Sequence, residues 1–259
     1  MMKKLVKIFV TILASLAGIL LSLYVIAYCM GEPDLNKNRY LKLYDDNQEI
    51  YYQSINDYTG HYVTLNNVSN YFKESIVAIE DQRFYDHRGF DPIGIMRALK
   101  VNFTNQKKSQ GASTITQQYA RLLYLTNEKS WSRKIKEAFL TMQLETRLSK
   151  DEILEGYINN VYFGHGIYGI ENAAQYFYGK SAKELDLNES SMLAGVVNGP
   201  TYYSPLNDAK AARKRQSIVL NALIDCKEIT VTQKQQVLDS DLNLAETHKV
   251  DDNMANNYY

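Results

Sequence analysis

Hydrophobic and polar positions follow two different patterns along the chain. From residue 8 to residue 30, 23 consecutive residues carry no charge, which is enough for a helix to cross a hydrocarbon layer of about 30 Å. From residue 67 to about residue 240, apolar residues instead recur every three or four positions, as they do on one face of an α-helix. The pattern predicts one transmembrane helix over residues 8–30 and a mainly α domain over residues 67–240.

Charges on either side of the uncharged run orient the predicted transmembrane helix. Lysines precede the run and acidic residues follow it, namely Lys3, Lys4 and Lys7, then Glu32 and Asp34. Because positive residues favour the cytoplasmic side, residues 1–7 are expected in the cytoplasm and the domain outside, which predicts a single-pass protein of the cell membrane. The alternative is a cleaved signal peptide, but its apolar core usually spans about 7 to 15 residues and ends at a small-x-small site, unlike this run.

Local signals divide the remainder of the chain. Residues 31–66 are predicted to form a stalk with a hairpin, because β-prone runs at residues 40–44 and 49–53 flank a turn-like Asp-Asp-Asn. Residues 241–259 form a polar tail. Helix starts are expected where a hydroxyl residue precedes Glu or Gln by three positions, at Thr114, Ser149 and Ser181, and another near Asp208.

Composition narrows the class of partner. With 45% hydrophobic and 12% aromatic residues the chain can build a core, and its zero net charge gives no reason to expect nucleic-acid binding. Charge is nevertheless clustered, because residues 88–136 contain ten basic residues and two acidic ones, a net charge of about +8. Outside the cytoplasm such a segment favours lipid phosphate or an anionic membrane surface, with a merely solvated basic face as the alternative.

The first candidate for chemistry lies in VAIEDQRFYDHRGF, residues 77–90. Glu80 falls at the border of a helical apolar stripe that includes Phe72, Ile76 and Ile79. Apolar surroundings disfavour the charged form of a carboxylate, so the pKa of Glu80 is expected to rise toward the range of a general base. An ordinary glutamate at a helix border is the alternative.

Two further segments carry a candidate anion site. GASTITQQYARLLYL, residues 111–125, is expected to begin a helix at Thr114, and the free amides of a first helical turn attract anions. In WSRKIKEAFLTMQLE, residues 131–145, one apolar face runs through Ile135 and the other lies beside Arg133 and Glu137. A helix buried on both faces would enclose the Arg133–Glu137 pair, either as part of the site or as a structural ion pair.

These segments, with ILEGYINNVYFGHGIYGIENAAQYFYGK (residues 153–180) and LAGVVNGPTYYSP (residues 193–205), resemble the peptidoglycan glycosyltransferase family, the transglycosylase domain of penicillin-binding proteins. The resemblance covers roughly residues 68–206 and follows the order of the family's motifs. It implies a lysozyme-like, two-lobed helical domain with a long cleft. Arg121 departs from the family pattern, which usually has Lys there, and Leu122 stands where a polar residue is common.

The resemblance also implies a reaction. Glu80 would be the general base that takes a proton from the acceptor sugar when lipid II is joined into a β-1,4-linked strand, with inversion and release of undecaprenyl pyrophosphate. Glu137 would be the second catalytic carboxylate. The remaining residues carried over would bind substrate; they are Asp81, Phe84, His87, Ser113, Thr114, Gln117, Gln118, Arg121, Arg133 and Lys134. A divalent cation, Mg²⁺ or Mn²⁺, is a candidate cofactor at the pyrophosphate, and Glu137 is its candidate ligand.

An absence from the sequence restricts the expected activity. The chain contains neither Ser-x-x-Lys nor Lys-Thr-Gly, the motifs of penicillin-sensitive transpeptidases, so a monofunctional enzyme with a separate transpeptidase partner is expected. The alternatives are a membrane-anchored glycan hydrolase, since two carboxylates in a cleft can also cut a glycan, and a non-catalytic scaffold.

Overall fold

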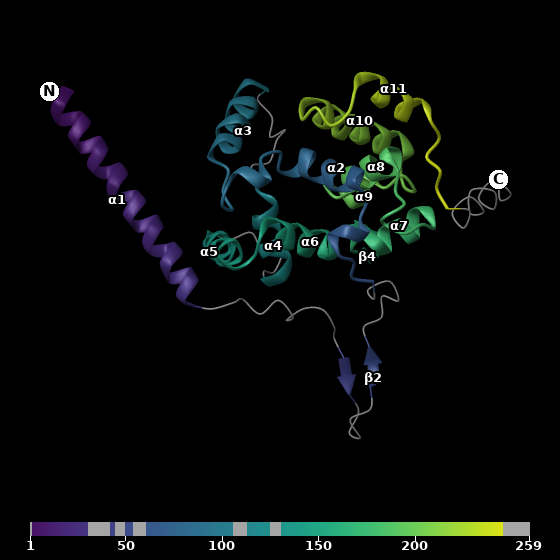
Figure 1. Ribbon diagram of the computed structural model, residues 1–259, viewed down its shortest axis with the longest axis horizontal. Coiled ribbons are helices and arrows are strands. Elements are labelled where there is room, and N and C mark those ends of the chain that lie inside the picture. The colour runs from purple at the N-terminus through teal and green to yellow at the C-terminus, as the bar shows by residue number, and fades with distance from the viewer. Residues whose placement is uncertain are drawn as a thin grey trace.

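The computed structural model describes residues 2–30, 42–44, 50–53, 61–105, 113–124 and 131–245, and their secondary structure is mainly helical, as predicted (Figure 1). The first part comprises α1 (Met2–Cys29), β1 (Lys42–Tyr44), β2 (Ile50–Gln53), η1 (Leu65–Asn67), α2 (Asn70–Glu80), η2 (Phe84–Asp86), α3 (Pro92–Asn105), α4 (Ile115–Tyr124) and α5 (Trp131–Arg147). The second part comprises α6 (Lys150–Asn160), β3 (Tyr162–Gly164), β4 (Ile167–Tyr168), α7 (Ile170–Tyr178), α8 (Leu187–Val196), α9 (Pro200–Tyr203), α10 (Ala209–Asp225) and α11 (Val231–Asp239).

The main hydrophobic core forms around α2. Its residues Phe72 and Ile76, one turn apart, are fully buried, and α2 packs against α8 and α10. Aromatic side chains from α6, β3 and α7 complete the core, including Tyr157, Phe163 and Phe177, each fully buried. The position of α2 in this core fixes the end of the helix, where Glu80 lies.

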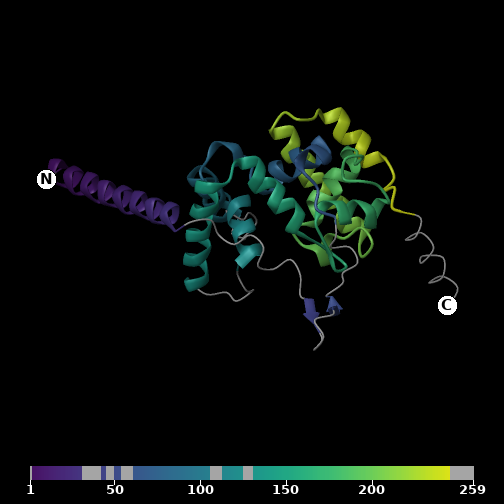
Figure 2. The same cartoon turned by 60° about the horizontal axis from the view of Figure 1, so that its bottom comes forward.

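A second group of helices, made up of α3, α4 and α5, lies to one side of this core. Helix α4 packs against both α5 and α6, and so joins the two groups. Figure 2 shows α3 and α5 on the side of the domain nearer α1, and α10 and α11 on the opposite side. A cavity lined by residues of α2, α3, α4 and α10 opens between the groups.

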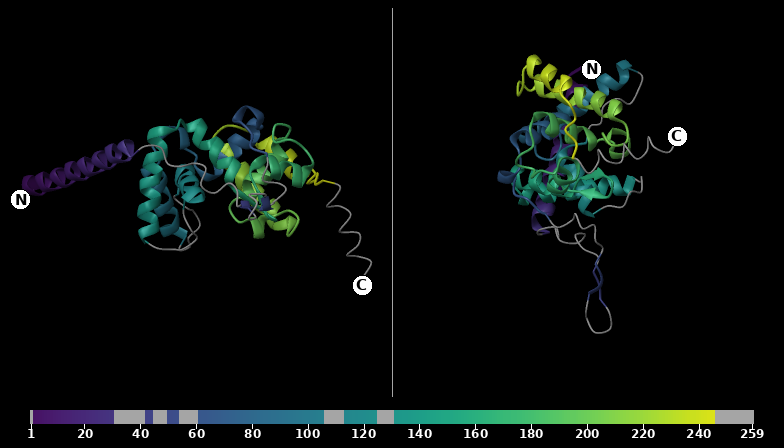
Figure 3. Two further views of the ribbon diagram at one scale, coloured as in Figure 1. Left: turned by 90° about the horizontal axis from the view of Figure 1, so that it is seen from below. Right: turned by 90° about the vertical axis from the view of Figure 1, so that its right-hand side faces the viewer.

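Helix α1 extends away from the domain but contacts it near its C-terminal end (Figure 3). The Tyr24 hydroxyl donates to the Arg88 carbonyl oxygen at 2.7 Å, and the Arg147 guanidinium lies 4.6 Å from the centre of the Tyr28 ring. None of the described helices combines the length and apolar composition that a membrane crossing needs. The membrane segment expected over residues 8–30 stays a prediction.

Both strands of the hairpin expected in the stalk are present. β1 pairs antiparallel with β2, with Lys42 opposite Gln53 and Leu43 opposite Tyr52, and the register shifts between Leu43 and Tyr44. The connecting residues 45–49, and residues 246–259 of the expected polar tail, lie outside the described part of the chain.

Most of the expected helix starts are confirmed. Thr114 and Ser149 each exchange both capping contacts with the residue three positions on, and Asp208 caps α10. The helix expected at Ser181 is wrong. Ser181 bonds Glu184 but closes only a turn, because Asp186 provides the competing cap for α8.

The prediction that the helix over residues 131–145 is buried on both faces is also wrong. In α5, Glu137 is buried, yet Trp131 and Ile135 are 88% and 69% exposed. Periodicity identified the apolar stripe correctly, but nothing in the described part of the chain covers its first turns.

Candidate active site

Glu80 is the last residue of α2 and lies between the two groups of helices. Its side chain is 11% exposed, because the same helix places Ile76 and Phe72 in the core. Gln118 Nε2 on α4 donates to Glu80 Oε2 at 2.9 Å. The other oxygen, Oε1, has no hydrogen-bond donor in the described structure and lies 4.0 Å from Arg215 Nη2.

Burial raises the pKa of Glu80 above its ordinary value, and the nearby Asp81 adds to this rise. The Gln118 hydrogen bond and the positive charges of Arg215 and Arg121 act in the opposite direction. The raised pKa confirms that part of the sequence prediction, and a carboxylate with one oxygen free of hydrogen bonds in the described structure can accept a proton there.

Asp81 holds the start of α4 against the end of α2. One carboxylate oxygen lies 2.9 Å from His87 Nε2, and the other accepts the backbone N–H of Ile115 at 3.0 Å. The Thr114 hydroxyl donates to the Gly89 carbonyl at 2.7 Å. These contacts position Gln118, one turn further along α4, beside Glu80.

The same contacts change the interpretation of the α4 N-terminus. The amide of Ile115 donates to Asp81, and that of Gln117 donates to the Thr114 hydroxyl. Because these two amides already have acceptors, the expectation that they are free to bind an anion is wrong. The cationic side chains that line the cavity are the remaining candidates for an anion site.

The cavity beside Glu80 has a volume of about 640 Å³. The structure brings together six of the predicted site residues in its lining, namely Glu80, Asp81, Ser113, Thr114, Gln118 and Arg121. Arg97 and Arg215 also line it and were missed from the sequence. Arg97 belongs to the basic segment already noted, whereas Arg215 follows Arg213 and Lys214 in a helix that carried no recognised motif.

Three predicted residues support the wall of the cavity instead of lining it. Phe84 is fully buried in the core, and His87 and Gln117 are buried and bonded to Asp81 and Thr114. Their predicted contacts with substrate therefore stay untested, while their packing against the site is visible.

Glu137 is part of a separate ion-pair cluster on α5. Its carboxylate is 1% exposed and accepts from Arg133 Nη1 at 3.1 Å and from Lys134 Nζ. None of these three residues lines the cavity beside Glu80. In the part of the chain that the structure describes, no group of three or more His, Cys, Asp or Glu side chains is placed to hold a metal ion.

Comparison with known proteins decides the family. The transglycosylase family model matches residues 47–224. The match begins before residue 67, where the sequence predicted the domain to start. The chain belongs to the transglycosylase family. This confirms the resemblance to the transglycosylase domain of penicillin-binding proteins.

Two penicillin-binding proteins of known sequence agree with this assignment. The chain is 43% identical over 204 residues to penicillin-binding protein 2D of Bacillus subtilis (strain 168), covering 78% of this chain and 30% of the relative. It is 44% identical over 173 residues to penicillin-binding protein 1A of Escherichia coli (strain K12), covering 67% and 20%. A crystal structure of penicillin-binding protein 1A from Haemophilus influenzae is similar with 18% identity and a TM-score of 0.44, covering 85% of this chain and 24% of that one. The chain thus spans less than a third of the length of these relatives.

Proposed function

We propose that this chain is a peptidoglycan glycosyltransferase that polymerises lipid II into β-1,4-linked glycan strands. The observation that carries the proposal is the buried Glu80 carboxylate, with a raised pKa, in a cavity that Arg97, Arg121 and Arg215 also line. A base beside cationic side chains suits a sugar transfer in which the leaving group is a pyrophosphate.

In this mechanism Glu80 accepts the proton of the 4-hydroxyl of the acceptor N-acetylglucosamine through Oε1, the oxygen that lacks a hydrogen bond. The deprotonated hydroxyl attacks the anomeric carbon of the donor N-acetylmuramic acid. The bond to undecaprenyl pyrophosphate breaks, and the anomeric configuration inverts. Gln118, bonded to the other carboxylate oxygen, fixes the direction of Glu80.

Negative charge grows on the pyrophosphate as it leaves, and cationic side chains stabilise it without a strong general acid. Arg121 lines the cavity and is the first candidate for this role. Arg133 and Lys134 already bond Glu137, so we propose that Glu137 holds these two cations in position for the donor. Two positive charges already lie against the Glu137 carboxylate and would repel a divalent cation there, so the expected Mg²⁺ or Mn²⁺ would arrive with the pyrophosphate.

The finer expectations belong to the same proposal. The chain acts in the cell membrane with its catalytic domain outside, supported by the uncharged run of residues 8–30 and its flanking charges. The activity proposed for these 259 residues is glycosyl transfer, since they carry neither of the two transpeptidase motifs.

A polymerisation assay tests this function. Purified protein in detergent is given labelled lipid II, and the products are sized on a gel. Glu80→Gln keeps the shape of the side chain but removes the base, so turnover should fall by about 10²- to 10⁴-fold while lipid II binding persists. Glu184→Gln, at an exposed turn, is the matched control and should polymerise normally.

Two results would overturn the proposal. The first is polymer formation by Glu80→Gln at the rate of the unchanged protein. The second is release of soluble fragments from purified cell wall without any polymer from lipid II, which would indicate the hydrolase instead.

A further inference from the structure

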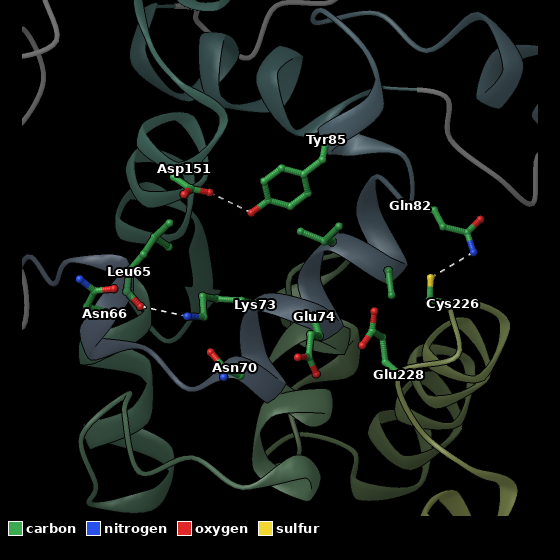
Figure 4. Close-up of a pocket in the computed structure, with 12 residues that line it drawn as sticks. Leu65, Asn66, Asn70, Lys73, Glu74, Gln82, Tyr85, Asp151, Cys226 and Glu228 are labelled. Carbon is green, nitrogen blue, oxygen red and sulfur yellow. Dashed lines mark hydrogen bonds between the residues drawn. The ribbon is translucent and has the colours of Figure 1, made fainter.

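A second cavity, of about 560 Å³, lies beside α2 (Figure 4). It is bounded by η1, α2, η2, the start of α6 and the connection between α10 and α11. Ala78 and Gln82 line both cavities, so the two adjoin at the end of α2. None of the residues assigned above to catalysis or substrate binding lines this second cavity.

Its lining combines apolar surface with hydrogen-bonding groups. Val77 and Ala78 lie on α2, and the 55% exposed Tyr85 adds an aromatic ring. The Tyr85 hydroxyl donates to Asp151 at 3.1 Å, which fixes the direction of the ring. Burial, together with the negative charge of Asp151, raises the pKa of Tyr85 to about 12. Amphipathic rings held in one orientation bind ligands that are apolar on one face and polar at the edge.

Amide side chains supply the polar part of the lining. Asn66 and Asn70 both line the cavity, and neither side chain has a hydrogen bond within the described residues. An amide both donates and accepts, so it can meet hydroxyl and acetamido groups in either direction.

The charges in the cavity restrict its ligand. Figure 4 shows Asp151 and Tyr85 on one side of it and Glu74 and Glu228 on the other. Burial raises the pKa of Glu74, and the charge of Glu228 raises it further. Lys73 lines the same space, with its ammonium group 3.2 Å from the Leu65 carbonyl oxygen. The lining holds three carboxylates and one ammonium group, so an anionic ligand meets like charges on several sides, and a cationic ligand meets the Lys73 ammonium group.

We propose that this second cavity is a binding site for an uncharged saccharide, adjoining the catalytic cavity at Gln82. The Gln82 side chain connects the two spaces, since its Nε2 donates to Cys226 Sγ at 3.2 Å and its Oε1 accepts from Arg97 in the catalytic cavity. A glycan held here lies next to the reaction without taking part in it. This inference rests on the proposed function for its choice of sugar, so its test is a binding measurement that needs no polymerisation.

Cys226 provides a reporter for the cavity that it lines. Cys29→Ser removes the other of the two cysteines, so alkylation by iodoacetamide then reports Cys226 alone. The probe is tetra-N-acetylchitotetraose, an uncharged β-1,4-linked oligosaccharide, added to the full chain in detergent. We expect it to slow alkylation in a saturable way, and we expect tetragalacturonate, an anionic oligosaccharide, to leave the rate unchanged.

Substitutions locate the bound sugar. Tyr85→Ala should weaken the protection about ten-fold because it removes the aromatic face, and Asn66→Ala, a milder change at an exposed position, should weaken it about three-fold. Tyr71→Ala is the matched control, since Tyr71 is also exposed and lies on α2 but does not line the cavity. Thermal unfolding checks that each variant is folded.

The proposal is wrong if chitotetraose leaves the alkylation rate unchanged, if Tyr85→Ala and Asn66→Ala are protected as well as Tyr71→Ala, or if tetragalacturonate protects equally. If the sugar gives no protection against alkylation but lipid II is polymerised normally, the saccharide site is wrong and the proposed function still stands. Protection that depends on Tyr85, in a chain that makes no polymer, would instead support the saccharide site and contradict the proposed function.

Discussion

Arg215 is expected to set the protonation of Glu80, and its charge can be removed by Arg215→Gln. The guanidinium Nη2 lies 4.0 Å from Glu80 Oε1, and the two side chains are 13% and 11% exposed. At this distance two unit charges interact by about 4 kcal/mol at an effective dielectric constant near 20, and by about 1 kcal/mol in water. Loss of the charge should therefore raise the pKa of Glu80, and an energy of up to about 4 kcal/mol corresponds to a change of up to roughly 1000-fold in its protonation equilibrium.

The sign of the effect on rate follows from the role of a base. Glu80 must be deprotonated to accept a proton, so a higher pKa moves the acidic limb of the pH profile of kcat/KM to higher pH. Below the limb, Arg215→Gln should lose about ten- to 1000-fold in kcat/KM, and the loss should shrink as the pH rises. Arg215→Lys keeps a positive charge and should leave the limb close to its original position.

The assay is continuous polymerisation of lipid II across a pH series, with the three proteins side by side. A loss of rate in Arg215→Gln that is the same at every pH, with an unmoved acidic limb, would refute the electrostatic reasoning. It would show that Arg215 binds substrate or supports the fold without tuning Glu80.

Three further predictions concern stability and metal ions. The pKa of Glu80 is raised in the folded state above its ordinary value of 4.5, so the charged form opposes folding, and stability is lost as the pH rises through the folded pKa. Glu80→Gln should therefore be more stable than the unchanged protein at neutral pH and should have a higher Tm, and an equal or lower Tm would contradict this. Gly89→Ala should lower the free energy of unfolding by about 2 to 4 kcal/mol in denaturant, because φ is +81° and the new Cβ would lie 2.6 Å from Thr141 Cγ2. Gly179→Ala, at φ +67° with nothing within 4 Å, should lower it by only about 1 to 2 kcal/mol. Equal losses would show that the contact with Thr141 is relieved. Glu137→Gln should slow polymerisation by the same factor with EDTA and at every Mg²⁺ concentration, because its carboxylate bonds Arg133 and Lys134, and rescue by added metal would show that it is a metal ligand.

The sequence alone determined those features of this protein whose physical cause is local. The capping of α4 and α6 depends on residues three positions apart, and the Arg133–Glu137 pair on residues one turn apart, so both were predicted before any tertiary contact was known. Glu80 was expected at an apolar helix border with a raised pKa, and the end of α2 places it there. The family motifs identified the domain for the same reason, since each is a short run of neighbouring residues.

Tertiary structure decided which of those local features face the site and which remain covered. Arg215 reaches Glu80 from a helix far along the chain, and Asp81 occupies an amide of α4 that seemed free when that helix was considered alone. Ile135 has the spacing of a core residue yet is 69% exposed. Hydrophobic spacing states which residues share a face of a helix, but burial depends on which other helix covers that face, and that is settled only when distant segments pack together.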